Sequence, residues 1–241
     1  MKAKWDLYLP KDTKLPQHIG IIPDGNRRWA RERGFPQLVG HKVGLLDQFP
    51  DIIVSAYEMG VPEVSIWLWS TENWDRSKEE IHYLFNDIYP LFMSKFYNFA
   101  QKHKIQVTHY GRRDRLPAKM IRETDKLIEK TKKFKKNKLN LCVDYGGRDE
   151  IVRGVQEAIK KGMSADQVTE KSFGELLDTK NSNPLDLVIR TGKVQRLSGF
   201  HSWMNSYSEF YFADCYFPDF SPLKLKEAIM DFSNRGRTFG K

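Results

Sequence analysis

Residues 21–30, IIPDGNRRWA, join an apolar run to an acid, a glycine, an amide and two arginines. Gly25 and Asn26 favour a tight turn whose backbone N–H groups can face an anion, and the arginines add positive charge. A carboxylate among phosphate-binding groups is explained by a Mg²⁺ ion between them, because Mg²⁺ takes one or two carboxylates together with substrate phosphates. Asp24 is therefore a candidate metal ligand; capping of a following helix is the alternative.

A second polar stretch, STENWDR (70–76), follows another apolar run and combines an acid, an amide, a tryptophan and an arginine. Ser70 or Thr71 could instead start a helix through a capping box, so the stretch also has a purely structural explanation. Trp67 and Trp69 precede it and, at alternate positions of a strand, would share one face. They would either line an apolar cavity or belong to the core, and the sequence favours neither.

A third stretch, RTGKVQRLS (190–198), places Arg190 and Arg196 on either side of a glycine and ends at Ser198. Two arginines and a hydroxyl group are natural partners of a diphosphate. Glu209 begins a later apolar run and could be a second metal ligand or a charge partner. The sequence has no Walker-type glycine–lysine run, which argues against ordinary nucleotide phosphoryl transfer.

Apolar strand-like runs alternate with helical patterns along the chain. The runs are HIGIIP (18–23), VSIWLW (64–69), IQVTHYG (105–111), LNLCVDYG (139–146), LDLVIR (185–190) and EFYFADC (209–215). The helical patterns cover 42–60, 78–103, 118–134 and 149–162, and Pro90 predicts a kink in the second. Several runs are apolar on both faces, which is typical of buried parallel strands. We therefore predict a single α/β domain over residues 1–241, with helices on both faces of a mostly parallel sheet.

In such sheets, ligands bind beyond the carboxyl ends of the strands. The three polar stretches each follow a predicted strand, and so does a fourth, YGGRDE (145–150). We expect all four to converge on one edge of the sheet. The site would then combine a metal carboxylate, two cationic sites of diphosphate size and an aromatic cavity.

The composition agrees with one large domain, because 241 residues with 40% hydrophobic content can bury a proper core. Cys142 and Cys215 lie in apolar segments and are expected to be reduced thiols, as in a cytoplasmic protein. We see neither a signal peptide nor an apolar run of the roughly 18–20 residues that span a bilayer. The net charge of +9 indicates an anionic partner. The lysine-rich stretch KTKKFKKNK (130–138) is a solvated loop or a contact with an anionic membrane surface.

These stretches together resemble the cis-prenyltransferases, the undecaprenyl diphosphate synthase family, from about His18 to Gly240. HIGIIPDGNRRWA is similar to the first signature of the family, WSTENWDR to the second and LNLCVDYGGRDEI to the third. DLVIRTGKVQRLSGF, with the tryptophan and YSEFYF that follow, is similar to the fourth and fifth. The end of the chain, RGRTFG (235–240), resembles a family tail that reaches the active site of the partner subunit.

The resemblance implies a homodimer of six-stranded parallel sheets, with residues 1–17 as an N-terminal extension and 235–241 as the tail. It implies Mg²⁺-dependent condensation of an allylic diphosphate with the homoallylic isopentenyl diphosphate, forming a Z double bond in isoprenoid biosynthesis. Asp24 would hold Mg²⁺ with help from Glu209, and Asn73 would assist removal of the proton. The donor diphosphate would be bound by Gly25, Asn26, Arg27, Arg28 and His41.

The remaining roles implied by the resemblance concern a lid and the second substrate. The lid would be shaped by Trp29, Trp74 and Arg76. These three residues are expected to contact substrate together with Ser70, Thr71 and Glu72. Isopentenyl diphosphate would be bound by Arg190, Arg196, Leu197 and Ser198.

The chain departs from the family pattern mainly in the half that would bind the acceptor. Val194 stands where the family usually has Glu, and Lys193 precedes it. Further departures are Gln37, Ser77, Met204 and Asp144, the last in place of the usual Asn. A second hypothesis is therefore prenyl transfer to another acceptor, such as a second allylic diphosphate. Less favoured are a non-catalytic partner subunit, which would be expected to lose Asp24 and Asn73, and a nucleic-acid binder, for which no module is present. The sequence does not indicate the length of the product.

Overall fold

The computed structural model describes residues 5–238 and contains one six-stranded sheet. The strands are β1 (His18–Ile22), β2 (Glu63–Ser70), β3 (Ile105–Tyr110), β4 (Asn137–Tyr145), β5 (Leu187–Arg190) and β6 (Glu209–Phe212). Their order is β3-β4-β2-β1-β5-β6, and every neighbouring pair is parallel. The predicted α/β class and mostly parallel sheet are confirmed.

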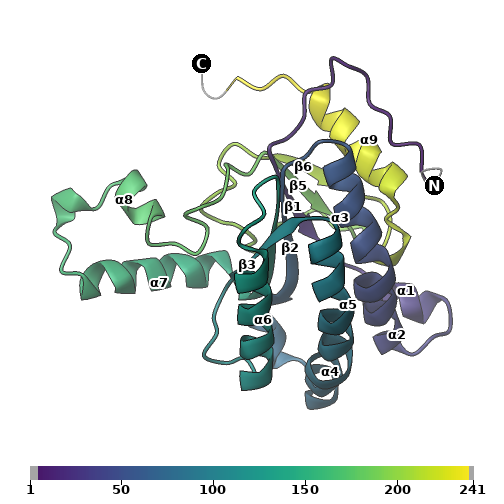
Figure 1. Ribbon diagram of the computed structural model, residues 1–241, viewed down its shortest axis with the longest axis horizontal. Helices are drawn as coiled ribbons and strands as arrows, with labels where there is room; N and C mark the ends of the chain where they lie inside the picture. Colours follow the sequence, from purple (N-terminus) through teal and green to yellow (C-terminus); the bar gives the residue numbers. More distant parts are fainter. Residues whose placement is uncertain (1–4, 239–241) are drawn as a thin grey trace.

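Four helices cover one face of the sheet: α3 (Phe49–Glu58), α5 (Tyr89–Lys102), α6 (Ala118–Thr131) and α9 (Pro222–Ser233) (Figure 1). Their apolar sides and the strands form the main core, which includes Phe49, Phe92, Leu127 and Ile229. Phe92 stacks on Phe96 with 4.7 Å between ring centroids. The hydrophobic layer therefore concentrates on this face.

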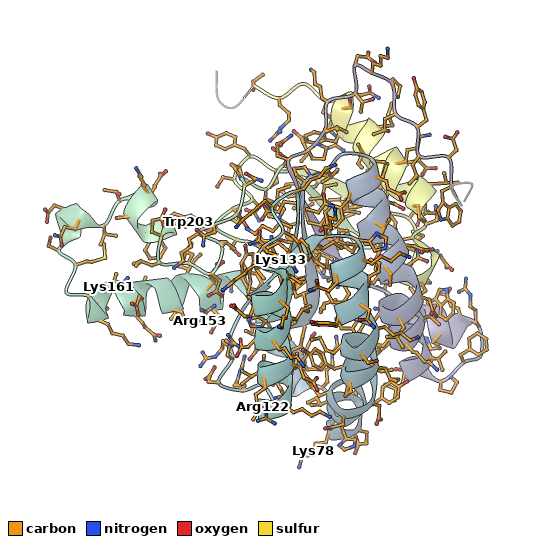
Figure 2. All side chains as sticks on the ribbon, viewed as in Figure 1. Lys78, Arg122, Lys133, Arg153, Lys161 and Trp203 are labelled. Atoms are coloured by element: carbon orange, nitrogen blue, oxygen red, sulfur yellow. The ribbon has the colours of Figure 1, made fainter. Side chains whose placement is uncertain are left out.

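The other face is covered by the start of α7 (Gly147–Lys160) and by the loops that follow α8 (Glu170–Gly174), which include Leu185 and Phe200. Only the first turns of α7 reach the sheet, where the Tyr145 hydroxyl donates to Glu150 at 2.6 Å. The rest of α7 and α8 project away from the body of the molecule (Figure 1). Arg153 lies along the inner part of this arm and Lys161 at its outer end (Figure 2). Helices thus occur on both faces of the sheet, as predicted, but one face carries most of them.

The two long helical patterns are divided by wider π-helical turns. The first consists of α2 (Gln37–Lys42), the π segment η1 (Val43–Gln48) and α3, and the second of α4 (Lys78–His82), η3 (Tyr83–Ile88) and α5. Each π segment is followed by a proline in the first turn of the next helix, Pro50 or Pro90. A proline lacks the N–H that an α-helix needs and crowds the preceding turn. The interruption predicted at Pro90 is present, but it takes the form of a π segment just before the proline.

A β-bulge in β2 overturns the prediction that Trp67 and Trp69 share a face. Trp67 pairs with Cys142 and Trp69 with the next residue, Val143, so an extra residue is inserted between the two tryptophans. A bulge breaks the alternation of side chains. Trp69 therefore packs in the main core, whereas Trp67 packs with the cluster on the opposite face.

The segment before β1 lies against α9 (Figure 1). The backbone N–H of Lys14 donates to the Ser233 hydroxyl at 2.8 Å, and Leu7, Leu9 and Leu15 pack against the core. Within residues 5–238, no helix combines the length and the apolar character needed to cross a membrane.

Candidate active site

A cavity of about 790 Å³ opens beyond the carboxyl ends of β1, β2 and β5. This volume lies within the range of roughly 300–1,000 Å³ typical of small-molecule sites. One end is polar and is formed by residues that follow the strands, and the other is apolar and is formed by the helices of the main core. Three of the four polar stretches contribute to the lining; YGGRDE does not, because Tyr145 and Glu150 are buried on the other face of the sheet.

The first stretch forms the turn into α1 (Asn26–Glu32). Its N-cap is Gly25, with φ of +98°, so the alternative of Asp24 as the helix cap is wrong. A Cβ atom at Gly25 would lie 2.4 Å from the ring of Tyr216, so both the backbone conformation and the space favour glycine here. The carboxylate of Asp24 remains available for chemistry at the cavity wall.

Asp24 lies between two arginines. Its Oδ2 is 2.8 Å from Nη2 of Arg190, and its Oδ1 is 3.3 Å from Nη2 of Arg28. The side chain of Arg190 is 6% exposed, whereas that of Asp24 is 30% exposed. The carboxylate is therefore fixed from inside the protein and open toward the cavity, as a ligand for a substrate-borne metal needs to be.

The sequence did not reveal Glu80, whose carboxylate lies close to two arginines and a histidine. Arg76 lies 2.6 Å from Glu80, His41 3.3 Å and Arg27 3.4 Å. The contact with His41, followed by the charges of Arg76 and Arg27, holds the pKa of Glu80 at about 2, well below its usual range. An acid in an ordinary helical turn gives no sequence signal of this role.

Close packing of two short helices brings His41 to this cluster. A Cβ atom at Gly40 would lie 1.9 Å from the carbonyl oxygen of Asn26, so only glycine lets α2 approach α1 so closely. His41, Asn26 and Arg27 consequently line the same end of the cavity.

The second stretch forms the 3₁₀ turn η2 (Thr71–Asp75). Ser70 and Asn73 form a capping box, in which the backbone N–H of Ser70 donates to Oδ1 of Asn73 at 3.1 Å. The amide nitrogen of Asn73 is thus the group with which it can act on a ligand. Ser70, Glu72, Asn73 and Arg76 line the cavity, whereas Thr71 and Trp74 do not. The capping box confirms the structural explanation of this stretch, and its functional explanation stays a prediction.

The third stretch places Arg190 and Ser198 in the cavity wall. Nη1 of Arg190 donates to the Ser198 hydroxyl at 2.8 Å and to the carbonyl oxygen of Arg196 at 2.5 Å. The side chains of Arg196 and Leu197 lie outside the cavity lining. Lys193 lies with its Nζ 5.1 Å from the centre of the Tyr216 ring, which Arg28 approaches at 5.4 Å.

Two further predicted residues lie away from the cavity lining. Nε1 of Trp29 donates to Asp219 at 2.7 Å. Glu209 begins β6 level with Leu187, whose other neighbour is Ile19, so it lies near the amino end of β1. Asp24 follows the carboxyl end of that strand, roughly 15 Å further along. Within one chain, the structure does not bring Glu209 and Asp24 together.

Glu209 instead contacts the C-terminal tail of its own chain. Arg235 lies 2.9 Å from Glu209, and Arg237 lies 2.7 Å from Asp186. Residues 239–241, which complete the predicted tail, lie outside the described part of the chain.

The apolar end of the cavity was largely missed from the sequence, because its side chains come from four separate helical segments and a strand. They are Leu45, Leu84, Phe85, Ile88, Tyr89, Phe92, Met120 and Val143. Phe92 lines the cavity, whereas Phe96 and Phe99, further along α5, do not. Trp67 and Trp69 also contribute to its lining, and Trp69 belongs to the main core as well.

Four buried polar atoms in the described part of the cavity wall have no hydrogen-bond partner: Asn26 Oδ1, His41 Nε2, Trp69 Nε1 and Arg190 Nε. Buried polar groups without partners are rare and call for an explanation, of which a ligand is one. Among residues 5–238, no group of three His, Cys, Asp or Glu side chains could hold a metal ion by itself. Asp24 therefore fits a metal only if substrate oxygens supply further ligands.

Comparison with known proteins connects this geometry to a family. The family model of undecaprenyl diphosphate synthase matches residues 22–240. An isoprenyl transferase of Aquifex pyrophilus is 41% identical over 228 residues, which are 95% of this chain and 97% of that protein. An isoprenyl transferase of Aquifex aeolicus is 38% identical, with the same coverage.

Two solved structures are similar to the whole chain. Lavandulyl diphosphate synthase from Lavandula x intermedia, solved in complex with dimethylallyl diphosphate, has a TM-score of 0.89 and 32% identity, and the match covers 96% of this chain and 100% of that chain. A probable undecaprenyl diphosphate synthase from Campylobacter jejuni has a TM-score of 0.78 and 30% identity, with 95% and 99% covered.

Proposed function

Because the chain belongs to the undecaprenyl diphosphate synthase family, we propose that its cavity joins an allylic prenyl diphosphate to isopentenyl diphosphate and forms a Z-prenyl diphosphate. The chain is a prenyltransferase, and the acceptor and the double-bond geometry are the proposed part. The observation that carries the proposal is a cavity whose lining combines cationic side chains from the strand ends with apolar side chains from the core helices. A prenyl diphosphate has the same division into an anionic head and an apolar chain.

The donor diphosphate is bound by α1 and the Glu80 cluster. Asn26, Arg27, Arg28 and His41 face the polar end of the cavity and supply hydrogen-bond donors and positive charge. They oppose the charge that develops on the diphosphate as its bond to the allylic carbon breaks. The prenyl chain lies against the apolar wall, which keeps water away from the electron-poor carbon.

The family typically uses a divalent metal, and we propose Mg²⁺ with Asp24 as its protein ligand. When bound, Mg²⁺ would neutralise diphosphate charge and so help the leaving group depart. Asp24 fits this role because its carboxylate is ordered by Arg190 and Arg28 yet open to the cavity.

The second diphosphate is bound by Arg190 and Ser198. The double bond of isopentenyl diphosphate attacks the allylic carbon, one new C–C bond forms, and a proton leaves the acceptor. Asn73 lines the same cavity and would position the group that takes this proton. Turnover of labelled isopentenyl diphosphate with a panel of allylic donors, followed by mass spectrometry of the products, tests the proposal; absence of any prenyl product would contradict it.

A second candidate acceptor is another allylic diphosphate. Lys193 adds a cation next to Tyr216 and Arg28, and Val194 replaces the acid that the family usually has. The similar lavandulyl diphosphate synthase was solved with dimethylallyl diphosphate, an allylic compound. Compared with the usual family pattern, Lys193 and Val194 make this stretch more positive and remove an acid. This difference in charge supports the alternative acceptor.

We also propose a homodimer formed through the projecting arm. Val152, Val155 and Ile159 lie on one side of α7 and are 55%, 46% and 72% exposed. Apolar residues spaced by three and four positions form a helical stripe that favours a protein partner. A second copy is the partner that best explains a tail expected to complete a neighbouring site. Contact of the lysine-rich stretch 130–138 with a membrane surface remains a prediction.

A further inference from the structure

Asp144 is a buried carboxylate near the carboxyl end of β4 that does not line the cavity. Its side chain is 0% exposed, and its φ of +52° is left-handed. The backbone N–H of Arg112 donates to its carbonyl oxygen at 2.9 Å. A left-handed backbone conformation is unfavourable for a residue other than glycine, and so is a buried charge. Their combination at Asp144 indicates that the surrounding structure holds this residue in place.

The carboxylate of Asp144 binds two side chains from different parts of the chain. Nε1 of Trp74 donates to Oδ1 at 2.9 Å, and Nε of Arg115 donates to Oδ2 at 2.9 Å. Nη2 of Arg115 also contacts Oδ1, and its guanidinium carbon lies 5.7 Å from the centre of the Trp74 ring. Trp74 is therefore held by a hydrogen bond at its edge and a cation near its ring.

Trp74 in turn supports the cavity wall from behind. Its ring stacks on Phe85 with 5.2 Å between centroids and a 4° interplanar angle, and it meets Trp69 edge-on at 5.6 Å. Phe85 and Trp69 line the cavity. Trp74 also follows Asn73 directly in the turn η2. Movement of Trp74 would shift both the wall and Asn73.

We propose that Asp144 and Arg115 are positioning residues that fix Trp74 and thereby hold η2, with Asn73, against the cavity. Asp144 accepts the N–H of Trp74, and Arg115 neutralises the charge that this acceptor carries. The inference rests on the proposed role of Asn73 in turnover. It adds two residues that do not touch the substrate and that include one of the departures from the family pattern.

The charge balance predicts how substitutions combine. Arg115→Met leaves the Asp144 carboxylate buried without its cation, which is strongly unfavourable. The carboxylate must then move toward water or take up a proton, and either change disturbs Trp74. Adding Asp144→Asn removes the charge while keeping an oxygen that can accept the Trp74 N–H. The double variant should therefore have a higher kcat than Arg115→Met alone.

The test compares Arg115→Met, the double variant Arg115→Met/Asp144→Asn, and Arg113→Met as the matched control. Arg113 lies two positions away and pairs with the exposed Asp125. We expect Arg115→Met to lower kcat about 10- to 100-fold, with the donor KM changed less than about twofold, because a small misplacement of a catalytic group costs this much. The double variant should recover most of the loss, and Arg113→Met should behave as the wild type.

Hydrogen exchange gives a readout that does not depend on turnover. Deuterium uptake in residues 70–76 should rise in Arg115→Met and return in the double variant. Unchanged uptake there would overturn the inference. The inference would also be overturned if the double variant had the same low kcat as Arg115→Met. The same holds if Arg113→Met lowered kcat as much as Arg115→Met does. If uptake responds as expected while wild-type protein makes no prenyl product, the proposed function fails and the positioning of η2 stands.

Discussion

The carboxylate of Asp24 and the guanidinium of Arg190 form an ion pair at 2.8 Å across 166 positions of sequence. β1 and β5 are adjacent parallel strands, and their carboxyl ends bring the two side chains together. The proposed metal ligand of the donor and the proposed anchor of the acceptor diphosphate are thus linked directly. Binding of a metal at Asp24 would free Arg190 for a second diphosphate, so the two substrates should bind with positive coupling.

Asp24→Ala should reduce kcat at least 100- to 1,000-fold, because alanine cannot supply the negative charge that would hold the metal against the diphosphate. Steady-state turnover of labelled substrate measures this, and circular dichroism establishes that the variant is folded. The exposed acid Asp166 provides a control, since Asp166→Ala should remain fully active. Near-normal turnover of folded Asp24→Ala, or full activity of the wild type in excess EDTA, would contradict the metal assignment.

Glu80→Gln should weaken donor binding and flatten the dependence of stability on pH. The folded pKa of about 2 lies below the ordinary value of 4.5, so the ionised carboxylate stabilises the fold. This contribution is fully present above pH 4.5 and is lost as the pH falls toward 2. Such a shift corresponds to on the order of 2–3 kcal/mol.

Urea unfolding of wild type, Glu80→Gln and Glu79→Gln at pH 6, 4 and 3 measures this contribution. Glu79 is the exposed neighbour and serves as the control. The wild type and Glu79→Gln should lose stability on acidification more steeply than Glu80→Gln. Parallel curves for all three proteins would rule out the role assigned to Glu80.

Val194→Glu should shift acceptor use toward isopentenyl diphosphate. The substitution restores the acid that the resembled family usually carries four positions after Arg190, and it offsets the charge of the adjacent Lys193. A charge change in a partly buried site is worth roughly 1–3 kcal/mol, or about 5- to 150-fold in relative use. A competition assay offers isopentenyl and dimethylallyl diphosphate together with a longer allylic donor. If the wild type already elongates efficiently to long Z-chains, the alternative acceptor is excluded.

Phe92→Leu should lengthen the product. Phe92 closes part of the apolar end of the cavity and stacks on Phe96, and a smaller side chain leaves more room for the growing chain. Stability should fall by about 1–2 kcal/mol, because packing is lost without a large cavity being opened. Chromatography of the products measures chain length, and Phe99→Leu, outside the cavity, is the control. The same product distribution in all three proteins would show that Phe92 does not limit length.

Ile159→Asp should dissociate the proposed homodimer. Ile159 is 72% exposed and lies on the apolar side of α7, where a charge would be buried by a second copy. Sedimentation velocity at micromolar concentration should show a dimer for wild type and a monomer for the variant. Lys161→Asp, at the end of the same helix, controls for the added charge. A wild-type monomer with full activity would refute the dimer, as would full activity after deletion of residues 235–241.

The order of strands and helices could be predicted from the sequence, because periodicity and apolar runs are local properties. The sequence also allowed us to predict that Asp24, Ser70, Asn73 and Arg190 lie at one common site. Each lies at or just beyond the end of a strand, and the carboxyl ends of parallel strands share one edge of the sheet.

Only the tertiary structure decided how these residues are held. The bulge in β2 sends Trp67 and Trp69 to opposite faces, and no residue in that stretch signals it. Glu80 meets His41 and Arg27, and Asp144 meets Trp74 and Arg115, through contacts between distant segments. Glu209 lies level with Ile19 at the far end of the strands, because register across β5 and β6 sets its distance from Asp24. Register, bulges and long-range pairing depend on which surfaces pack together, and a single sequence carries little information about that packing.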